Sequence, residues 1–173
     1  MDLKKEIREI LNYPKEGIGF KDLTTLMKNK EAFNFVVNEI SGYFKNRGIT
    51  KVVGMEARGF IFGGAIAAKL GAGFVPIRKR GKLPAPVISE TYTLEYGEDQ
   101  VEMHRDAINE NDIVLIHDDL LATGGTAKAA LEIVRKIGVK KVYFSFVCDL
   151  EFIKTDMKDE VKSHDIQILV TYQ

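Results

Sequence analysis

The sequence contains a single cysteine, Cys148, and no tryptophan. One thiol can form neither an intramolecular disulfide nor a multi-cysteine zinc site. A chain of 173 residues buries enough surface to fold without such cross-links. This scarcity of cysteine is typical of a reducing compartment, and we expect a cytoplasmic protein.

The sequence also lacks net charge and long apolar runs. Lys and Arg total 25, as do Asp and Glu, which argues against a general nucleic-acid-binding protein. The longest apolar run, residues 59–68, is about half as long as the ~20 residues that a membrane span requires. The N-terminus carries both signs of charge, so no secretory signal is expected. We therefore expect one soluble domain, residues 1–173, with neither a nucleic-acid nor a membrane partner.

The apolar periodicity predicts alternating strands and helices, which is typical of an α/β fold with a mainly parallel sheet. Helices are expected at residues 3–11, 33–48, 60–70 and 126–137. Strands are expected at residues 51–55, 74–77, 113–116, 142–147 and 166–170, with a hairpin formed by 91–94 and 100–103. Residues 12–22 and 78–100 are expected as loops, and a loop as long as the second is often a functional lid.

The most informative segment follows the apolar strand 113–116. Asp118 and Asp119 come next, and the small-residue turn at 122–126 leads into a helix. Free backbone N–H groups at a helix N-terminus bind phosphate, and adjacent acids could hold sugar hydroxyls or a hydrated metal ion. A phosphorylated sugar with a cis-diol could bind the turn through its phosphate and the two acids through its hydroxyls. One alternative is a helix cap beside a solvated acidic turn. The other is the Walker B strand of a P-loop nucleoside triphosphatase, although the sequence has no P-loop motif.

The run Asp-Asp-Leu-Leu-Ala-Thr-Gly-Gly-Thr at 118–126 resembles the phosphoribosyl pyrophosphate motif of type I phosphoribosyltransferases. Its form is that of the branch acting on adenine. Four further stretches occur in the family's order and extend the resemblance over about residues 13–147: Tyr13-Pro14 with Gly17 and 20–22, then 56–60, 77–84 and 94–97. The resemblance implies a parallel sheet flanked by helices, a small N-terminal hood of about residues 1–30 and a flexible lid of about residues 78–100.

The resemblance implies that this enzyme, a pentosyltransferase of purine salvage, transfers phosphoribose from phosphoribosyl pyrophosphate to adenine and forms AMP. It assigns the ribose 5-phosphate to Asp118, Asp119, Ala122, Thr123, Gly124, Gly125 and Thr126. It assigns the pyrophosphate to Glu56, Ala57, Arg58, Arg78, Lys79, Lys82 and Tyr96, with the Glu56–Ala57 peptide in the cis form. Without the resemblance, Arg58 is also compatible with a surface ion pair, and residues 78–82 with a solvated basic turn.

For the base, the resemblance implies recognition by backbone groups near Ile18 and Lys21, with Phe20 and Leu120 on its two faces. Glu95 would face the adenine N7 and, with Arg58, act in catalysis; its alternative is an exposed hairpin glutamate. The resemblance further implies a homodimer and Mg²⁺ held by substrate and water near Asp118 and Asp119, with no direct protein ligand.

This chain departs from many family members within the expected base-recognition loop, where it has Glu16, Gly19 and Lys21. His117 stands where an aliphatic residue is common. The loop departures leave two other hypotheses open. One is transfer to a 6-oxopurine such as hypoxanthine or guanine; the other is a ligand-sensing regulator of the same fold that lacks catalysis.

Overall fold

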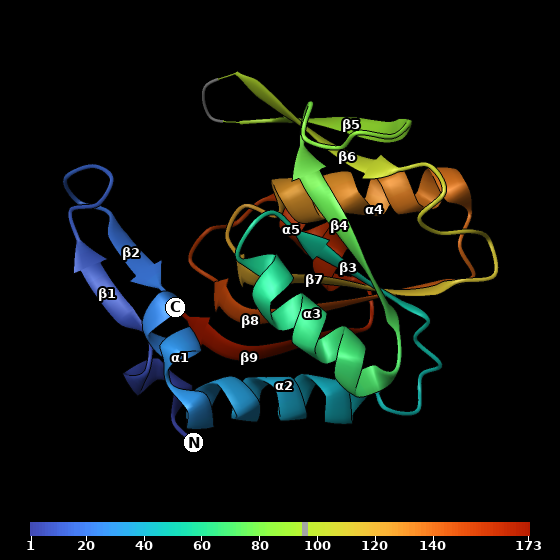
Figure 1. Ribbon diagram of the computed structural model, residues 1–173. Coiled ribbons are helices and arrows are strands. Elements are labelled where there is room, and N and C mark those ends of the chain that lie inside the picture. The colour runs from blue at the N-terminus through green and yellow to red at the C-terminus, as the bar shows by residue number, and fades with distance from the viewer. Residues whose placement is uncertain (95–96) are drawn as a thin grey trace.

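The centre of the molecule is a seven-stranded sheet with the order β5-β6-β4-β3-β7-β8-β9 (Figure 1). The computed structural model describes residues 1–94 and 97–173. Five strands run parallel, and they are β3 (Lys51–Met55), β4 (Gly73–Lys79), β7 (Ile113–Leu121), β8 (Lys141–Leu150) and β9 (Ile166–Tyr172). The strands β5 (Val87–Thr93) and β6 (Glu98–His104) add an antiparallel extension to the edge at β4. The expected α/β fold with a mainly parallel sheet is confirmed.

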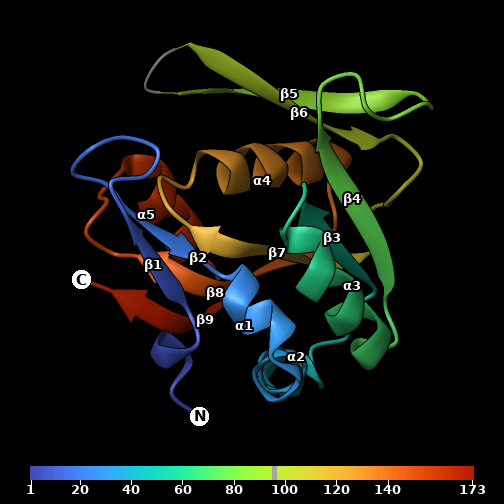
Figure 2. The same ribbon diagram turned by 60° about the vertical axis from the view of Figure 1, so that its left-hand side comes forward.

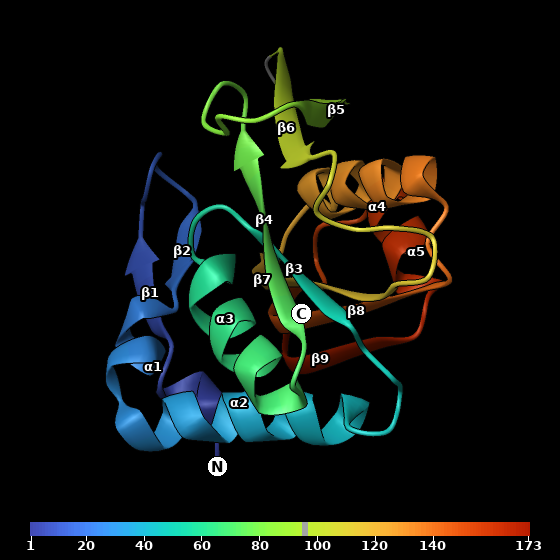
Figure 3. The same cartoon turned by 45° about the vertical axis from the view of Figure 1, so that its right-hand side comes forward.

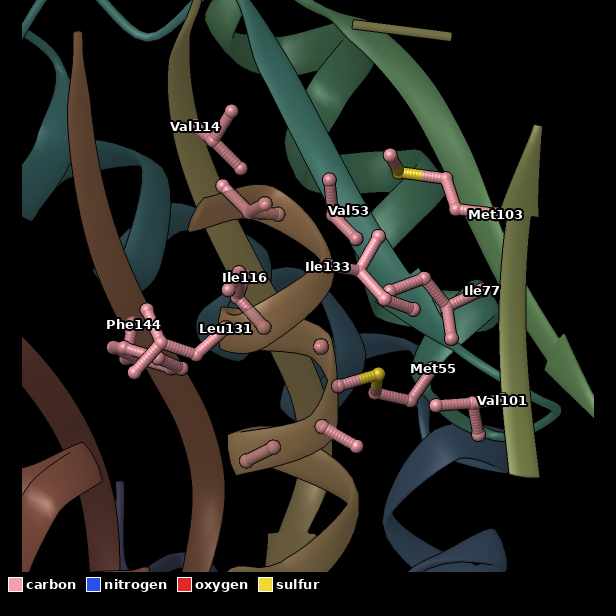
Figure 4. Close-up of a cluster of buried hydrophobic side chains, with 14 of the residues drawn as sticks. Val53, Met55, Ile77, Val101, Met103, Val114, Ile116, Leu131, Ile133 and Phe144 are labelled. Atoms are coloured by element: carbon pink, nitrogen blue, oxygen red, sulfur yellow. The ribbon is translucent and has the colours of Figure 1, made fainter. Parts of the chain in front are cut away.

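Helices cover both faces of the sheet. Two of them, α2 (Lys30–Phe44) and α3 (Gly59–Leu70), pack on one face, where Val36, Ile40, Phe62, Ile66 and Leu115 form part of the core. On the other face lie α4 (Gly125–Ile137) and α5 (Asp156–Lys162). In α4 the apolar residues recur every three or four positions, and Figure 4 shows Leu131 and Ile133 against Val53, Ile116 and Phe144 of the sheet. None of these helices, nor any other in the described residues, is long and apolar enough to cross a membrane.

The direction of winding reverses between β3 and β7. From β3 the chain passes through α3 to β4 on one side, whereas from β7 it passes through α4 to β8 on the other. In such a sheet the two connections leave from opposite faces, and a crevice opens at the carboxyl ends of the two strands. The segments that follow β3 and β7 therefore lie side by side, although about 60 residues separate them in the chain.

The prediction of a helix at residues 3–11 is wrong. Only a 3-10 turn forms at Leu3–Lys5, and β1 (Arg8–Leu11) then pairs antiparallel with β2 (Gly19–Asp22), which lies within an expected loop. Leu3 and Ile7 are buried, but Leu11 is 73% exposed, so the apolar residues do not share one buried face. Pairing with a distant segment therefore outweighs the local helical periodicity. The short helix α1 (Thr24–Lys28) follows β2 and was not expected.

The expected long loop at 78–100 is mostly strand. Residues 78–79 complete β4, and β5 and β6 form the expected hairpin, with Thr91 opposite Gln100. The hairpin lies over α4 (Figures 1 and 2), where Lys136 Nζ is 2.6 Å from Glu90 Oε2. Figure 3 shows β4 leading directly from the parallel sheet into this extension. The hairpin is thus an ordered continuation of the sheet in this conformation.

Two further elements at the carboxyl end of the sheet differ from expectation. Strand β7 does not stop at Ile116 but continues through Asp118 and Asp119 to Leu121, because β8 pairs with it along this length. Helix α5 lies in the last part of the chain, for which no helix was expected. Pairing with β8 accounts for the length of β7, whereas α5 begins at a local N-cap, Thr155.

His117 lies inside the sheet with no exposed surface. Its neighbours in register are Gly54 on β3 and Ser145 on β8, and its Nδ1 is 2.8 Å from Ser145 Oγ. Burial lowers the pKa of His117 from 6.5 to about 3, so the folded protein holds a neutral imidazole at ordinary pH.

We therefore expect His117 to reduce stability in mild acid. Between pH 6.5 and about 3 the unfolded chain binds a proton at this residue and the folded chain does not. This residue should lower the free energy of unfolding by up to about 1.4 kcal/mol per pH unit in that range. Urea unfolding from pH 7 to 5 without divalent cations should show a shallower decline for His117→Leu than for the wild type. Parallel declines would contradict a neutral buried His117.

Candidate active site

The end of β7 and the start of α4 enclose a small pocket of about 80 Å³. Asp118 and Leu120 of β7 line it together with Phe146 of β8 and the turn residues Leu121, Ala122, Thr123, Gly124, Gly125, Thr126 and Ala127. Gly124 is the N-cap of α4 and supplies no side chain, while Gly125 N–H donates to Thr123 Oγ1 at 3.3 Å. The positive end of the helix and its first amides therefore border a pocket suited to a small anion.

Asp118 lines this pocket and Asp119 follows it in β7, and the surroundings of both carboxylates shift their pKa values. Asp119 is 2% exposed, and Arg58 Nε lies 2.8 Å from its Oδ2. Burial raises the pKa of Asp118 well above its usual value, and the adjacent Asp119 charge adds to this effect. Burial also raises the pKa of Asp119, against the opposing charge of Arg58. Two acids held this way bind cationic or hydroxyl-bearing ligands that relieve their repulsion.

The turn after β3 lies against the acids. A Cβ added to Gly59 would come 2.8 Å from Asp118 Oδ1, which shows how closely the start of α3 approaches β7. The Glu56–Ala57 peptide is cis, as the family resemblance implied. The structure therefore brings residues 56–59 and residues 118–119 together.

Glu56 gathers the cations of the next strand. Its carboxylate accepts from Lys79 N–H at 2.7 Å and from Lys82 Nζ at 2.7 Å, and Arg78 lies 3.3 Å away. Burial raises the pKa of Glu56, but these donors more than compensate and hold it at about 2. The side chain of Glu56 therefore organises the cations, and its backbone N–H donates to the Ile77 carbonyl at 2.9 Å.

Lys79 is held by two residues that the sequence did not indicate. Its Nζ lies 2.7 Å from the Tyr92 hydroxyl and forms an ion pair with Asp99. Tyr92 and Asp99 come from the two strands of the hairpin, so their meeting with Lys79 depends on the register of β5 and β6. No spacing in the sequence signals this contact. Arg58, Arg78, Lys79 and Lys82 are thus each paired with a carboxylate of the same chain.

The four residues expected to recognise the base lie in different surroundings. The Phe20 ring faces Arg58, with 5.7 Å between the ring centroid and Cζ, and Leu120 lines the pocket. The N–H and C=O groups of Ile18 both bond within the turn of the N-terminal hairpin. The Lys21 ammonium lies 2.7 Å from Glu9 Oε1 and 4.3 Å from the centroid of the Tyr172 ring. The structure therefore brings Phe20 and Leu120 to the site and directs the Lys21 side chain elsewhere.

Two expected residues, Glu95 and Tyr96, lie outside the described residues. Within the described ranges, no three His, Cys, Asp or Glu residues gather as a cluster that could hold a metal ion.

Residues 21–168 match the family model described as the phosphoribosyl transferase domain, and the chain belongs to this family. Similarity to curated proteins identifies the subgroup of this family to which the chain belongs. A curated relative from Bacteroides thetaiotaomicron, an adenine phosphoribosyltransferase, is 52% identical over 169 residues, with 96% of each chain covered. Within the family, the chain groups with the adenine phosphoribosyltransferases.

Solved structures of relatives agree with this placement. Adenine phosphoribosyltransferase from Thermoanaerobacter pseudethanolicus has a TM-score of 0.90 and 42% identity, covering 99% of this chain and 98% of that chain. The enzyme from Giardia lamblia, complexed with 9-deazaadenine, has a TM-score of 0.91 and 37% identity, covering 99% of this chain and 97% of that chain.

The packing of Gly124 generates a stability prediction. Its φ is +84°, and an added Cβ would lie 2.8 Å from the backbone N and Cα of Lys158. Gly124→Ala should lower the free energy of unfolding by about 2–4 kcal/mol, through a left-handed conformation and a clash with backbone. Gly138 at the other end of α4 is the matched control, because its φ is +78° and nothing lies within 4 Å of an added Cβ.

Gly138→Ala should therefore cost only the conformational part, about 1–2 kcal/mol. Urea denaturation of both variants measures the difference between them. Equal losses would mean that the contact between Gly124 and Lys158 does not constrain the turn.

Proposed function

We propose that this protein catalyses the transfer of phosphoribose from phosphoribosyl pyrophosphate to N9 of adenine, forming AMP and pyrophosphate. One observation carries the proposal: a phosphate-sized turn follows β7, the turn that carries Arg58 follows the neighbouring parallel strand β3, and Arg58 pairs there with the buried Asp119 of β7. The relatives named adenine phosphoribosyltransferase support the choice of adenine. In this reading the chain is a pentosyltransferase of purine salvage.

The ribose 5-phosphate would occupy the pocket at residues 122–126. Backbone N–H groups and the positive end of α4 would bind the phosphate. Asp118 and Asp119 would accept hydrogen bonds from the two ribose hydroxyls. This arrangement fixes the sugar at both ends and leaves its C1 exposed to attack.

The leaving pyrophosphate would bind between the turn at residues 56–59 and the cations at the end of β4. Arg58, Arg78, Lys79 and Lys82 would neutralise the charge that grows as the C1–O bond lengthens and the sugar ring becomes cation-like. In the structure these cations hold Asp119, Glu56 and Asp99 instead. An incoming pyrophosphate would therefore exchange with carboxylates of the chain and would meet cations that are already gathered.

The base would lie between Phe20 and Leu120, in line with C1. Backbone groups near Ile18 and Lys21 would read its edge. The N–H and C=O of Ile18 are engaged within the hairpin turn, so their use requires the hood of about residues 1–30 to adjust or to share these bonds. The cation–π contact between Phe20 and Arg58 supports a hood that lies next to the reaction centre.

Residues 78–100 would act as a lid that excludes water, since water would attack the same carbon. Glu95 would exchange a proton at adenine N7, and Tyr96 would approach the pyrophosphate; the family resemblance supports both roles. We further propose a homodimer, in which a cation of residues 78–82 reaches the neighbouring site, and a cytoplasmic location. A buried, unbonded Cys148 is compatible with a reducing compartment.

The residues present are suited to Mg²⁺ bound largely through substrate. This ion usually keeps several waters and takes one or two carboxylates together with substrate oxygens. Asp118 lines the pocket and Asp119 follows it in β7, so the ion would lie near both acids while substrate oxygens and water hold it. Bound there, the ion would neutralise negative charge on the phosphoribosyl pyrophosphate.

A competition reaction tests the proposed function. The protein is incubated with Mg²⁺, phosphoribosyl pyrophosphate and equal amounts of adenine, hypoxanthine, guanine and uracil, and the nucleotides are separated. We expect AMP alone. Formation of IMP or GMP would support phosphoribosyl transfer and would contradict adenine as the acceptor base. Absence of any nucleotide would instead favour the ligand-sensing regulator.

A second prediction concerns the pH dependence of substrate use. The diol needs an ionised Asp118, whose pKa is raised by burial and by Asp119. As the pH falls through this raised pKa, kcat/KM for phosphoribosyl pyrophosphate should fall. Asp118→Asn should lower kcat/KM by about 10- to 100-fold at pH 8, through loss of charge-assisted hydrogen bonds.

The ratio of wild-type to Asp118→Asn kcat/KM isolates the residue, because ionisation of the substrate affects both proteins equally. We expect this ratio to shrink as the pH falls from 8 to 5. A ratio close to one throughout that range would remove Asp118 from sugar binding, and a large but constant ratio would contradict its titration there.

A further inference from the structure

The phosphate turn is supported from behind by the last helix of the chain. The backbone of Lys158, in the first turn of α5, lies so close to Gly124 that an added Cβ there would come within 2.8 Å of it. This contact places the start of α5 directly against the turn at residues 122–126. The family motif ends at Thr126, so α5 belongs to none of the stretches that indicated the function.

A single hydroxyl joins the two segments. Thr155 Oγ1 donates to the carbonyl oxygen of Thr123 and accepts from Lys158 N–H at 3.1 Å as the N-cap of α5. The Thr123 carbonyl and the Gly124 N–H belong to one planar trans peptide and point in opposite directions. By holding that carbonyl toward α5, Thr155 turns the Gly124 N–H away from α5, and Gly124 is one of the residues that line the pocket.

Helix α5 is itself fixed by a buried ion pair. Lys158 Nζ lies 2.6 Å from Asp149 Oδ1, and the side chains are 3% and 1% exposed. The ammonium also donates to the carbonyls of Leu150 and Ile153, while Lys162 pairs with the second oxygen of Asp149. A buried charge pair with this many partners enforces one geometry, because any displacement leaves a charge unpaired.

The ion pair is anchored at the same place as the acids of the site. Asp149 lies on β8 opposite Leu121, the last residue of β7. The ion pair therefore ties α5 to the strand ends that carry Asp118 and Asp119. Turn, helix and acids form one connected unit.

We propose that Thr155, held in place by the Lys158–Asp149 pair, is a positioning residue for the 5′-phosphate subsite. It acts through the Thr123–Gly124 peptide and does not touch the substrate. This inference rests on the proposed function for the identity of the ligand. Its expected signature is selective: binding of the phosphate end of the sugar weakens, while base recognition and the chemical step are unaffected.

The test is Thr155→Val, which keeps the shape of the side chain and removes the hydroxyl. Calorimetric titration with ribose 5-phosphate should show a dissociation constant raised about five- to tenfold, the value of one hydrogen bond. The KM for phosphoribosyl pyrophosphate should rise by the same factor. The KM for adenine and kcat should change by less than about twofold.

Two control variants sharpen the result. Thr155→Ser retains the hydroxyl and should restore ribose 5-phosphate binding to near the wild-type value. Ser163→Ala removes a hydroxyl at the opposite end of α5, where Ser163 Oγ donates to the Glu160 carbonyl, and should leave binding unchanged. Thermal unfolding establishes that each variant is folded under the assay conditions.

Folded Thr155→Val with unchanged affinity for ribose 5-phosphate would overturn the positioning role. So would an equal loss for phosphoribosyl pyrophosphate and adenine, which would indicate a general structural defect. If the wild type makes no nucleotide in the competition reaction, the proposed function fails instead. Calorimetry then still separates the two cases, because it reports the phosphate subsite without turnover.

Discussion

The reversal of winding between β3 and β7 is the constraint on which the rest of the site depends. Because α3 and α4 leave these neighbouring strands toward opposite faces, nothing in the sheet closes the gap at their carboxyl ends. The cis turn at residues 56–57, the two acids of β7 and the N-terminus of α4 all meet there. The two hydrophobic clusters on either face hold the strands that present these groups, so the packed core and the site share the same geometry.

Charge balance is the second property of the site. Glu56, Asp99 and Asp119 hold four cations close to one another, where without these carboxylates they would repel. A pyrophosphate that binds as proposed would not have to assemble its partners, which would lower the cost of reorganisation. The same ion pairs balance these cations within a chain that has no net charge.

The sequence predicted the sheet well, because buried strands such as residues 113–116 and 142–147 carry local signals in β-branched and aromatic residues. It also predicted the small-residue turn between β7 and α4, because the residues that form this turn are contiguous in the sequence. It failed at residues 3–11, where pairing with β2 overrides the helical period, and at the extent of β7, which β8 determines. The contact of Lys79 with Tyr92 and Asp99 depends on hairpin register. Thr155 followed by Asp156 is a recognisable N-cap signal in the sequence. The contact of Thr155 with Thr123 depends on the tertiary structure and has no such signal.

The two adjacent glycines of the turn are confined by different parts of the molecule. Gly124 meets the backbone of α5, whereas a Cβ on Gly125 would come 3.2 Å from the Tyr92 ring of the hairpin. One wall of the turn therefore belongs to a helix anchored by a buried ion pair, and the other to a strand of the antiparallel extension. The two sides of the turn therefore respond differently when the hairpin moves. Displacement of the hairpin would open space beside Gly125 alone, and the Gly124 peptide would keep its orientation.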